Sequence, residues 1–348
     1  MAMNGPLFRA KAPLRVSFAG GGTDVPPFPD QEGGLVLNAT INKYAFGTLS
    51  PREDDEITIE SADFDLAVSY REDEPLALDG KLDLVKAAIR GLGGRGGSGF
   101  DLFLHSSAPP GSGLGSSSTV MVALIGVLKA FHNLPLTEYE VAELAYTIER
   151  RDLGIKGGHQ DQYAATFGGF NFIEFFEDRV IVNPLKIRRD VINELEHNML
   201  LCYTGATRRS DRIIEDQTRR FEGHESGTLE GLRMQKELAV EMKNVLLRGR
   251  LDDFGELLHN AWEHKKQLSP RVSNEFLDEA YAVAREAGAL GGKITGAGGG
   301  GYMLLYTRFD RKHRVAEALR KLDVIPTEFA FEFRGLDTWS VGRERTAR

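Results

Sequence analysis

The residues from Pro109 to Ser118 form the segment best suited to binding phosphate. They read Pro-Pro-Gly-Ser-Gly-Leu-Gly-Ser-Ser-Ser and lie between an expected strand and an expected helix. Small residues let backbone N–H groups close around phosphate oxygens, and the N-terminus of a helix adds free donors and a favourable dipole. A flexible loop with a serine N-cap is the alternative. We favour phosphate binding and expect its contacts at Pro110, Gly111, Ser112, Gly113, Leu114, Gly115, Ser116, Ser117 and Ser118.

Four charged residues are candidates for acid–base or phosphate chemistry. Glu149 closes an expected helix, Asp161 lies among glycines just before an apolar stretch, and Asp24 follows three glycines. Each acid has a simpler alternative as a solvated charge, a turn or a helix cap. Arg15 lies on an otherwise apolar strand, where an unpaired buried cation is costly, so we expect an anionic partner for it. A strand-edge position that reaches water is the alternative.

Two further glycine patches have different interpretations. Residues 91–99 fit the dinucleotide pattern G-x-G-x-x-G twice, but a helix-like segment precedes them and a strand follows, so we expect a turn. Residues 293–301 read Lys-Ile-Thr-Gly-Ala-Gly-Gly-Gly-Gly before an apolar strand. Four consecutive glycines weaken a fold through backbone entropy. This second patch therefore indicates close packing against a ligand or another loop, with a plain loop as the alternative.

The composition excludes several classes of function. The 348 residues include 43 Lys+Arg and 51 Asp+Glu, a formal charge of −8 that counts against a nucleic-acid binder. The one cysteine excludes an internal disulfide and a cysteine-based zinc site. No Walker loop, H-E-x-x-H or G-x-S-x-G motif occurs. The N-terminus lacks the apolar run of a signal peptide, and the stretch 120–128 is too short for a bilayer, so we expect a cytoplasmic protein without a membrane partner.

The length favours two domains, which we place at 1–190 and 191–348. A capping-box pattern at Thr137 and Glu140 opens one of the expected helices. Periodicity predicts helices over 116–131, 136–151, 210–221, 231–247, 251–266, 273–287 and 311–322. It predicts strands over 14–19, 101–106, 170–176, 180–182, 199–204, 302–306 and 327–333.

Taken together, these segments resemble the GHMP kinase superfamily, named for galactose, homoserine, mevalonate and phosphomevalonate kinases. The superfamily's second motif, Pro-x-x-x-Gly-Leu-Gly-Ser-Ser, stands at 109–117, its C-terminal glycine-rich motif at 293–301, and its N-terminal motif at 11–24. The resemblance implies an α+β fold of two domains, the first ribosomal-protein-S5-like and the second ferredoxin-like with extra helices. It also implies that ATP and Mg²⁺ bind with a small-molecule sugar phosphate.

The resemblance assigns roles to the charged residues. In sugar-kinase members, an aspartate at the position of Asp161 is the base for the sugar hydroxyl, and an arginine at that of Arg15 lies near it and the γ-phosphate. Positive charge there favours an ionised carboxylate and stabilises charge in transfer. A serine and a glutamate at the positions of Ser117 and Glu149 hold Mg²⁺. The sugar site is expected at Asp24, Gly22, Thr23, Gly158, Gly298 and Gly299, with Lys156, Arg208 and Arg209 for the substrate's own phosphate.

Two phrases, residues 15–28 and 153–165, most resemble the branch that phosphorylates heptose 7-phosphate for nucleotide-activated heptose synthesis. That likeness implies phosphorylation of the anomeric C1 hydroxyl to a 1,7-bisphosphate. Fucokinases share a related first phrase, typically with tryptophan where this chain has Gly22, and remain an alternative. A non-catalytic sugar or nucleotide sensor is a second alternative, and the presence of Asp161, Glu149 and Arg15 speaks against it. An NAD-dependent dehydrogenase rests only on the glycine patterns at 91–99.

Overall fold

Two antiparallel-rich sheets with helices packed against them make up the protein. The computed structural model describes residues 6–342 except 64, 72–75, 93–98 and 206–209. Within these residues the first sheet holds β1 (Leu7–Ala19), β2 (Gly34–Pro51), β3 (Glu56–Ser61), β4 (Leu66–Arg71), β5 (Phe100–Ser106), β6 (Phe170–Phe175), β7 (Val180–Pro184) and β12 (Asp337–Val341). The second holds β8 (Met199–Tyr203), β9 (Ala289–Ile294), β10 (Tyr302–Thr307) and β11 (Ile325–Thr327).

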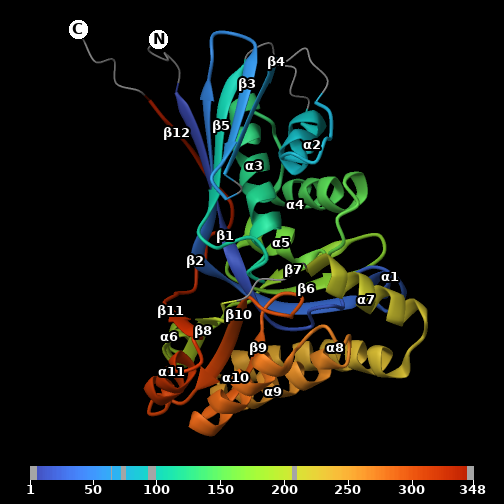
Figure 1. The fold of residues 1–348 in the computed structure, drawn as a ribbon, viewed down its shortest axis with the longest axis vertical. Coiled ribbons are helices and arrows are strands. Elements are labelled where there is room, and N and C mark those ends of the chain that lie inside the picture. Colours follow the sequence, from blue (N-terminus) through green and yellow to red (C-terminus); the bar gives the residue numbers. More distant parts are fainter. Residues whose placement is uncertain (1–5, 64, 72–75, 93–98, 206–209, 343–348) are drawn as a thin grey trace.

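The helices divide between the two sheets. Those on one face of the first sheet are α2 (Asp83–Gly91), α3 (Ser116–His132), α4 (Glu138–Tyr146) with the π-helical turn η1 (Thr147–Asp152), and α5 (Gln160–Phe167). Those that accompany the second are α6 (Arg189–Asn198), α8 (Ser226–Leu247), α9 (Leu251–Lys266), α10 (Glu275–Ala287) and α11 (Lys312–Arg320). Two more, α1 (Phe28–Glu32) and α7 (Ser210–Glu222), lie at the side of the junction between the two parts (Figure 1).

Strands β1 and β2 run from one part of the molecule into the other (Figure 1). The first sheet has the order β12-β1-β2-β5-β3-β4, and β6 adds to the first half of β2 while β5 pairs with its second half. Strand β12, near the end of the chain, returns to pair with β1. The long central strands therefore give the two parts a shared frame.

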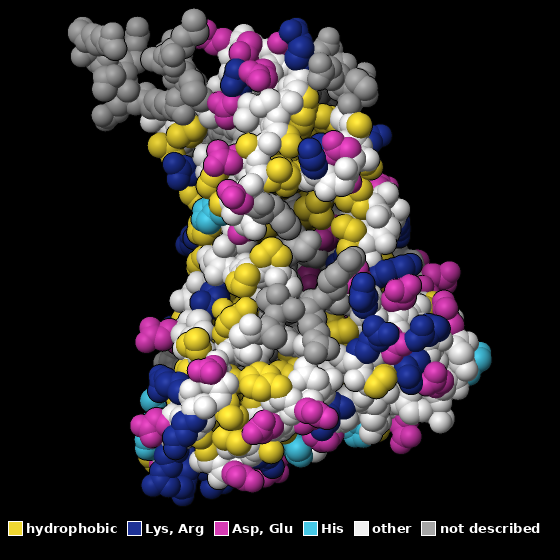
Figure 2. Space-filling model, viewed as in Figure 1, with side chains coloured by type: hydrophobic (Ala, Val, Ile, Leu, Met, Phe, Trp, Pro, Cys, Tyr) yellow, Lys and Arg dark blue, Asp and Glu magenta, His cyan; other side chains and the backbone are white. Residues whose placement is uncertain are grey.

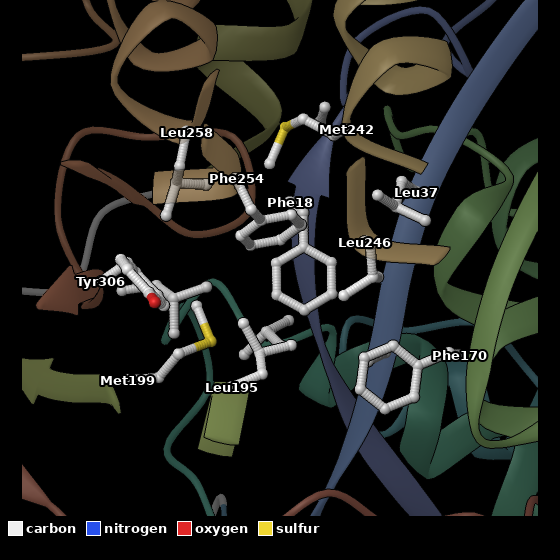
Figure 3. Close-up of a cluster of buried hydrophobic side chains, with 14 of the residues drawn as sticks. Phe18, Leu37, Phe170, Leu195, Met199, Met242, Leu246, Phe254, Leu258 and Tyr306 are labelled. Atoms are coloured by element: carbon white, nitrogen blue, oxygen red, sulfur yellow. The ribbon is translucent and has the colours of Figure 1, made fainter. Parts of the chain in front are cut away.

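A hydrophobic cluster fills the space between the two parts. Phe18 of β1 makes an edge-to-face contact with Phe254 of α9 at 5.2 Å and stacks on Phe170 of β6 at 6.2 Å. Figure 3 shows these rings together with Met242 and Tyr306, which come from helices and strands of the second part. Full burial of one such side chain contributes about 1.5–3 kcal/mol, so this core ties the two parts together.

Because α3 and α5 cover one face of β1 and α8 and α9 cover the other, β1 is buried on both faces. Leu14, Val16 and Phe18 belong to the shared core. The alternate residue Arg15 reaches the opposite side, where its guanidinium bonds Asp161 of α5. The alternation of side chains along a strand thus sends one set into the core and the other toward the site.

Several sequence predictions differ from the structure in detail; for example, β1 begins at Leu7 rather than at 14, and α8 begins at Ser226 rather than at 231. The helix expected over 136–151 ends as α4 at Tyr146 and continues as the π-helical turn η1, although its capping box at Thr137 and Glu140 is confirmed. The N-cap of α3 is Gly115 rather than a serine. The strand expected over 327–333 ends at Thr327, because Phe331 instead packs on the shared core and makes an isolated bridge to Ile41. Finally, β2 was not predicted; its residues 36–41 are buried at every position, so this half of the strand does not alternate in polarity.

The surface gives no sign of a single charged face in the view of Figure 2, where acidic and basic side chains are interspersed. Among the described residues, no helix is both long and apolar enough to span a bilayer. The turn expected at 91–99 lies mostly outside the described residues, because 93–98 are not described.

Candidate active site

A cavity of about 760 Å³ opens where the two parts meet. Its lining brings together the glycine-serine loop before α3, the loop before α5, the start of α7, and parts of α9 and of the C-terminal glycine-rich loop. Predicted site residues that line it are Arg15, Gly22, Asp24, Pro110, Gly111, Ser112, Gly113, Gly115, Ser116, Ser117, Ser118, Lys156, Gly158, Asp161 and Gly298. Glycines from four segments of the chain, at 21–22, 111–115, 154–158 and 296–298, therefore line the same cavity.

The loop before α3 is shaped by glycine. Gly111, Gly113 and Gly115 all have φ between 75° and 79°, a region that other residues rarely adopt. Gly115 is also the N-cap of α3 and supplies no side-chain hydrogen bond. The N–H groups of the first helical turn are thus left for a ligand, as at many phosphate-binding helix termini.

The two glycine-rich loops pack directly against each other. A Cβ on Gly113 would lie 2.6 Å from the carbonyl oxygen of Thr295, and one on Gly301 would lie 2.2 Å from that of Ser112. The backbone N–H of Tyr302 donates to the same Ser112 carbonyl at 3.1 Å. The close packing that the run of glycines predicted is confirmed, and its partner is the other loop.

Arg15 and Asp161 form an ion pair in the cavity wall, in which Arg15 is buried and Asp161 is partly exposed. The Arg15 Nε and Nη2 atoms lie 2.7 and 2.6 Å from Asp161 Oδ1, and Nη1 donates to the Gly113 carbonyl at 2.8 Å. The anionic partner predicted for Arg15 is therefore confirmed. Asp161 Oδ2 has no hydrogen bond to any described residue and faces Gly115, whose Cβ would lie 3.2 Å away. One oxygen of this carboxylate is fixed and the other is open.

Asp24 is buried and held by three donors. Its Oδ1 accepts from the Gly22 N–H at 3.0 Å and from the Gln160 side chain at 3.3 Å, and its Oδ2 accepts from the Gln160 N–H at 3.1 Å. Burial raises the pKa of this carboxyl, and the hydrogen bond from the Gln160 backbone opposes the rise. Gly158 is needed beside it, since a Cβ there would lie 2.0 Å from Oδ2. Asp24 thus caps the start of α5 as well as lining the cavity.

Ser117 and Glu149 lie next to each other. The Ser117 hydroxyl donates to Glu149 Oε1 at 3.1 Å, and the Gln162 amide donates to Oε2. Glu149 is fully buried behind Ser117 and is not itself among the lining residues. The π-helical turn η1 carries Glu149 on its buried side, and such turns are frequent at functional sites.

This pair of oxygen donors fits Mg²⁺, which takes one or two carboxylates and completes its shell with substrate phosphates and water. No group of three or more His, Cys, Asp or Glu residues suited to a metal occurs in the described part of the chain. A metal held by Ser117 and Glu149 would take its remaining ligands from water or a bound molecule.

Other predicted residues lie apart from the cavity wall. Thr23 is buried, and its hydroxyl bonds the backbone of Gly20 and Leu35. Leu114 is buried in the core and its carbonyl accepts from the Arg15 N–H. Gly299 is not among the lining residues; its N–H donates to Val272. Arg208 and Arg209 fall outside the described residues.

Two basic residues of the cavity wall were not predicted. Arg150 donates to Ser118 Oγ at 3.3 Å, beside the serine–glutamate pair. Lys265 comes from α9 and donates to the Gly296 carbonyl. The spacing of the apolar face of α9 holds a signal for Lys265, since Phe254, Leu258 and Ala261 recur at helical intervals and Lys265 falls on the same buried face.

His159 is excluded as an acid–base group near neutral pH. Its ring stacks on Tyr146 at 3.6 Å between ring centroids, and burial lowers its pKa to about 3. The imidazole is therefore neutral and a weak base, which leaves Asp161 as the acid–base candidate of this loop.

Comparison with known proteins adds a family to this geometry. Residues 83–169 match the model of the GHMP kinases N terminal domain, and residues 242–324 match that of the GHMP kinases C terminal. The D-glycero-alpha-D-manno-heptose 7-phosphate kinase of Campylobacter jejuni is 42% identical over 337 residues, which cover 96% of this chain and 99% of that protein.

A solved structure and a second relative extend the comparison. The crystal structure of a D-glycero-D-manno-heptose 1-phosphate kinase from Bacteroides thetaiotaomicron is 37% identical, with a TM-score of 0.81 over 96% of this chain and 99% of that one. The bifunctional fucokinase/GDP-fucose pyrophosphorylase of Arabidopsis thaliana is 28% identical over 86% of this chain but only 30% of its own length.

Proposed function

The chain belongs to the GHMP kinase family, and on that premise we propose that it is an ATP- and Mg²⁺-dependent kinase for D-glycero-D-manno-heptose 7-phosphate. The reaction transfers the γ-phosphoryl group of ATP to the anomeric C1 hydroxyl and yields the 1,7-bisphosphate, for nucleotide-activated heptose synthesis in the cytoplasm. The observation that carries this proposal is the carboxylate of Asp161, with one oxygen on Arg15 and the other open beside the phosphate-binding loop.

Asp161 is the base of the proposed reaction. Its open Oδ2 takes the proton of the sugar hydroxyl as the new oxygen–phosphorus bond forms. The bond from the γ-phosphorus to its bridging oxygen breaks at the same stage, and ADP leaves with that electron pair. Since phosphoryl transfer needs mainly alignment and charge stabilisation, a base held by two bonds from Arg15 is well suited to it.

Arg15 and the helix α3 stabilise negative charge in this scheme. The Arg15 guanidinium is held between Asp161 and the Gly113 carbonyl, so its charge lies at the loop that receives the phosphates. Ser117 and Glu149 would hold Mg²⁺, which supplies neutralisation of the triphosphate charge when bound. Arg150, next to Ser118, adds a further positive charge on the phosphate side.

The sugar is expected on the other side of Asp161. Asp24, Gly22 and Gly158 lie there around the start of α5, and Lys156 is an exposed cation of the same wall. We assign Asp24 to a sugar hydroxyl and Lys156, with Arg208, to the phosphate already on the substrate. Thr23 and Gly299 lie behind this surface, where their hydrogen bonds to backbone carbonyls keep the loops in position.

The two heptose kinases are named for substrates that already carry a phosphate at different carbons, C7 in one and C1 in the other. The relative named for the 7-phosphate is the more identical of the two, 42% against 37%, which favours C1 as the site of transfer here. A fucokinase is the second candidate, because the Arabidopsis relative matches 86% of this chain.

An ATP-consumption assay over free sugars and sugar phosphates tests the proposal. We expect turnover with heptose 7-phosphate that depends on Mg²⁺ and is lost in Asp161→Asn. Fast turnover with fucose and none with heptose 7-phosphate would reassign the substrate. Absence of turnover with every sugar would remove the kinase function itself.

A further inference from the structure

Lys265 is a buried cation with unused hydrogen-bonding capacity. Its ammonium group carries three N–H donors. One of them goes to the Gly296 carbonyl, and no other hydrogen bond or ion pair joins Lys265 to a described residue. Only 4% of the residue is exposed, yet it lines the cavity. A buried charge without further partners is costly, which indicates that a ligand supplies the missing acceptors.

Lys265 lines the same cavity as Arg15, Asp24 and Asp161. Burial is the main cause that lowers its pKa and repulsion from Arg15 lowers it further, while the carboxylates of Asp24 and Asp161 raise it. Its ammonium group therefore shares a cavity with the proposed base and the proposed sugar ligand. It reaches that space from α9, which belongs to the second part of the molecule.

Gly21 leaves an open position directly beside this ammonium. A Cβ on Gly21 would lie 3.5 Å from Ser17 Oγ, 3.6 Å from Gln160 Nε2 and 4.0 Å from Lys265 Nζ. The Ser17 hydroxyl is buried and has no hydrogen-bond partner among the described residues. A donor with spare capacity and an unpaired acceptor thus come together where a side chain is missing.

We propose that Lys265 is a substrate-binding residue that donates to a secondary hydroxyl of the sugar, in the space that Gly21 leaves open next to Ser17. A sugar hydroxyl fits this pair because it accepts from an ammonium and donates to the oxygen of a second hydroxyl at the same time. The assignment rests on the proposed sugar-kinase function and adds specificity for one secondary hydroxyl of the sugar. It also makes the second part of the molecule a direct contributor to sugar recognition.

Steady-state kinetics of Lys265→Met test this assignment, with Lys266→Met as the matched control. Lys266 is the next residue of α9, and its ammonium pairs with Glu263 at 2.9 Å. We expect Lys265→Met to raise the KM for heptose 7-phosphate about tenfold or more, the usual effect of losing a hydrogen bond from a charged group, and to leave the KM for ATP within about twofold. The control is expected to leave both unchanged. A rise confined to ATP, or no change in either KM, overturns the assignment.

Gly21→Ala provides an independent variant if Lys265→Met does not fold. Its methyl group meets its neighbours at ordinary contact distances, and the φ of Gly21 is not in the left-handed region. We expect this variant to unfold at the wild-type temperature and to bind the sugar more weakly, because the methyl fills the proposed hydroxyl position. An unchanged sugar KM in Gly21→Ala counts against the assignment.

Monodeoxy analogues of heptose 7-phosphate separate recognition from a purely structural role. At one carbon, removal of the hydroxyl is expected to weaken binding to the wild type but not to Lys265→Met. Equal losses for every analogue in both proteins mean that Lys265 only supports the Gly296 loop, and they overturn the assignment. Wild-type turnover decides the proposed function separately: its absence with all sugars refutes the kinase, whereas its presence with an unaltered Lys265→Met refutes only this inference.

Discussion

The buried charges on the two sides of the cavity differ in their partners. On the side of the first part of the chain, Arg15 is paired with Asp161, and Glu149 behind the wall accepts from Ser117 and Gln162. On the side of the second part, which also carries Asp211 and Glu215, the buried Lys265 has the Gly296 carbonyl as its one described partner. A paired group has a fixed orientation, which suits a base or a metal ligand, whereas a buried donor without partners is completed by substrate. The contrast indicates that the first side supplies the chemistry and the second contributes to recognition.

The glycines on the two sides of the cavity also have different roles. Gly115 on the first side brings backbone close to the Asp161 carboxylate. Gly301 on the second brings its backbone against Ser112, so that the two loops meet. A side chain at 115 would crowd the Asp161 carboxylate, whereas one at 301 would push the two loops apart.

The largest effect is expected from Asp161→Asn. The amide keeps the shape of the carboxylate but cannot take the hydroxyl proton, so kcat should fall about a hundredfold to ten-thousandfold. The KM for the sugar should change far less. Stopped assays of ADP formation measure both, with Asp178→Asn, an exposed residue paired only with Arg179 among the described residues, as the control. A kcat within a few fold of the wild type would remove Asp161 as the base.

Gly115→Ala should follow, with a loss of about tenfold in kcat, because Asp161 must shift by a few tenths of an ångström to make room and small displacements of a catalytic group lower its rate. The new methyl would lie 3.2 Å from Asp161 Oδ2, at a φ of 78°. Gly80→Ala has a similar φ of 86° with no atom within 4 Å, so it reproduces the backbone strain alone. If both variants lose the same activity at equal thermal stability, the crowding of Asp161 is not the cause.

Glu149→Gln should weaken the dependence on metal. The amide retains one oxygen but loses the charge, so the Mg²⁺ concentration for half-maximal rate should rise about tenfold. The rate at saturating Mg²⁺ should recover in part. Titration of the activity with MgCl₂ at fixed ATP measures this shift, and a titration curve that superimposes on that of the wild type would argue against Glu149 as a ligand.

The smallest effect concerns pH. Burial lowers the pKa of Lys265 to about 8 from its usual value of 10.5, so its positive charge is present at pH 7 and is lost as the pH rises through 8. The KM for the sugar should therefore rise several-fold between pH 7 and 9.5. Arg15, Asp24, Asp161 and Lys293 face the same ammonium and set where this change occurs. In Lys265→Arg the KM should be flat over that range, and an equal rise in both proteins would assign the titration to another group.

Local sequence patterns predicted much of the fold. The helix expected over 251–266 has the bounds of α9, and α3 extends only one residue beyond its expected end at 131. Helix α9 has an apolar face at helical spacing, α3 is a long apolar run, and both have clear ends. The strand β2 was missed because residues 36–41 are buried at every position and do not alternate, and η1 was missed because a π-helical turn has the same local composition as the helix it interrupts.

Part of the candidate active site could also be predicted from the sequence. The cost of burying a cation predicted an anionic partner for Arg15, but the partner lies 146 positions away and only the resemblance pointed to Asp161. Lys265 was not predicted, although its place on the apolar face of α9 marked it as a buried charge. The role proposed for Lys265 depends on which residues of the first part of the chain lie opposite it, and a local sequence pattern does not carry that information.

The product of the reaction tests the central claim most directly. Wild-type protein, ATP, Mg²⁺ and heptose 7-phosphate should give a new ³¹P resonance coupled to the anomeric proton, at a rate that Asp161→Asn abolishes. That result would join the open carboxylate of Asp161 to transfer at C1. A phosphate on any other carbon, or the same resonance at an undiminished rate in Asp161→Asn, would contradict the account.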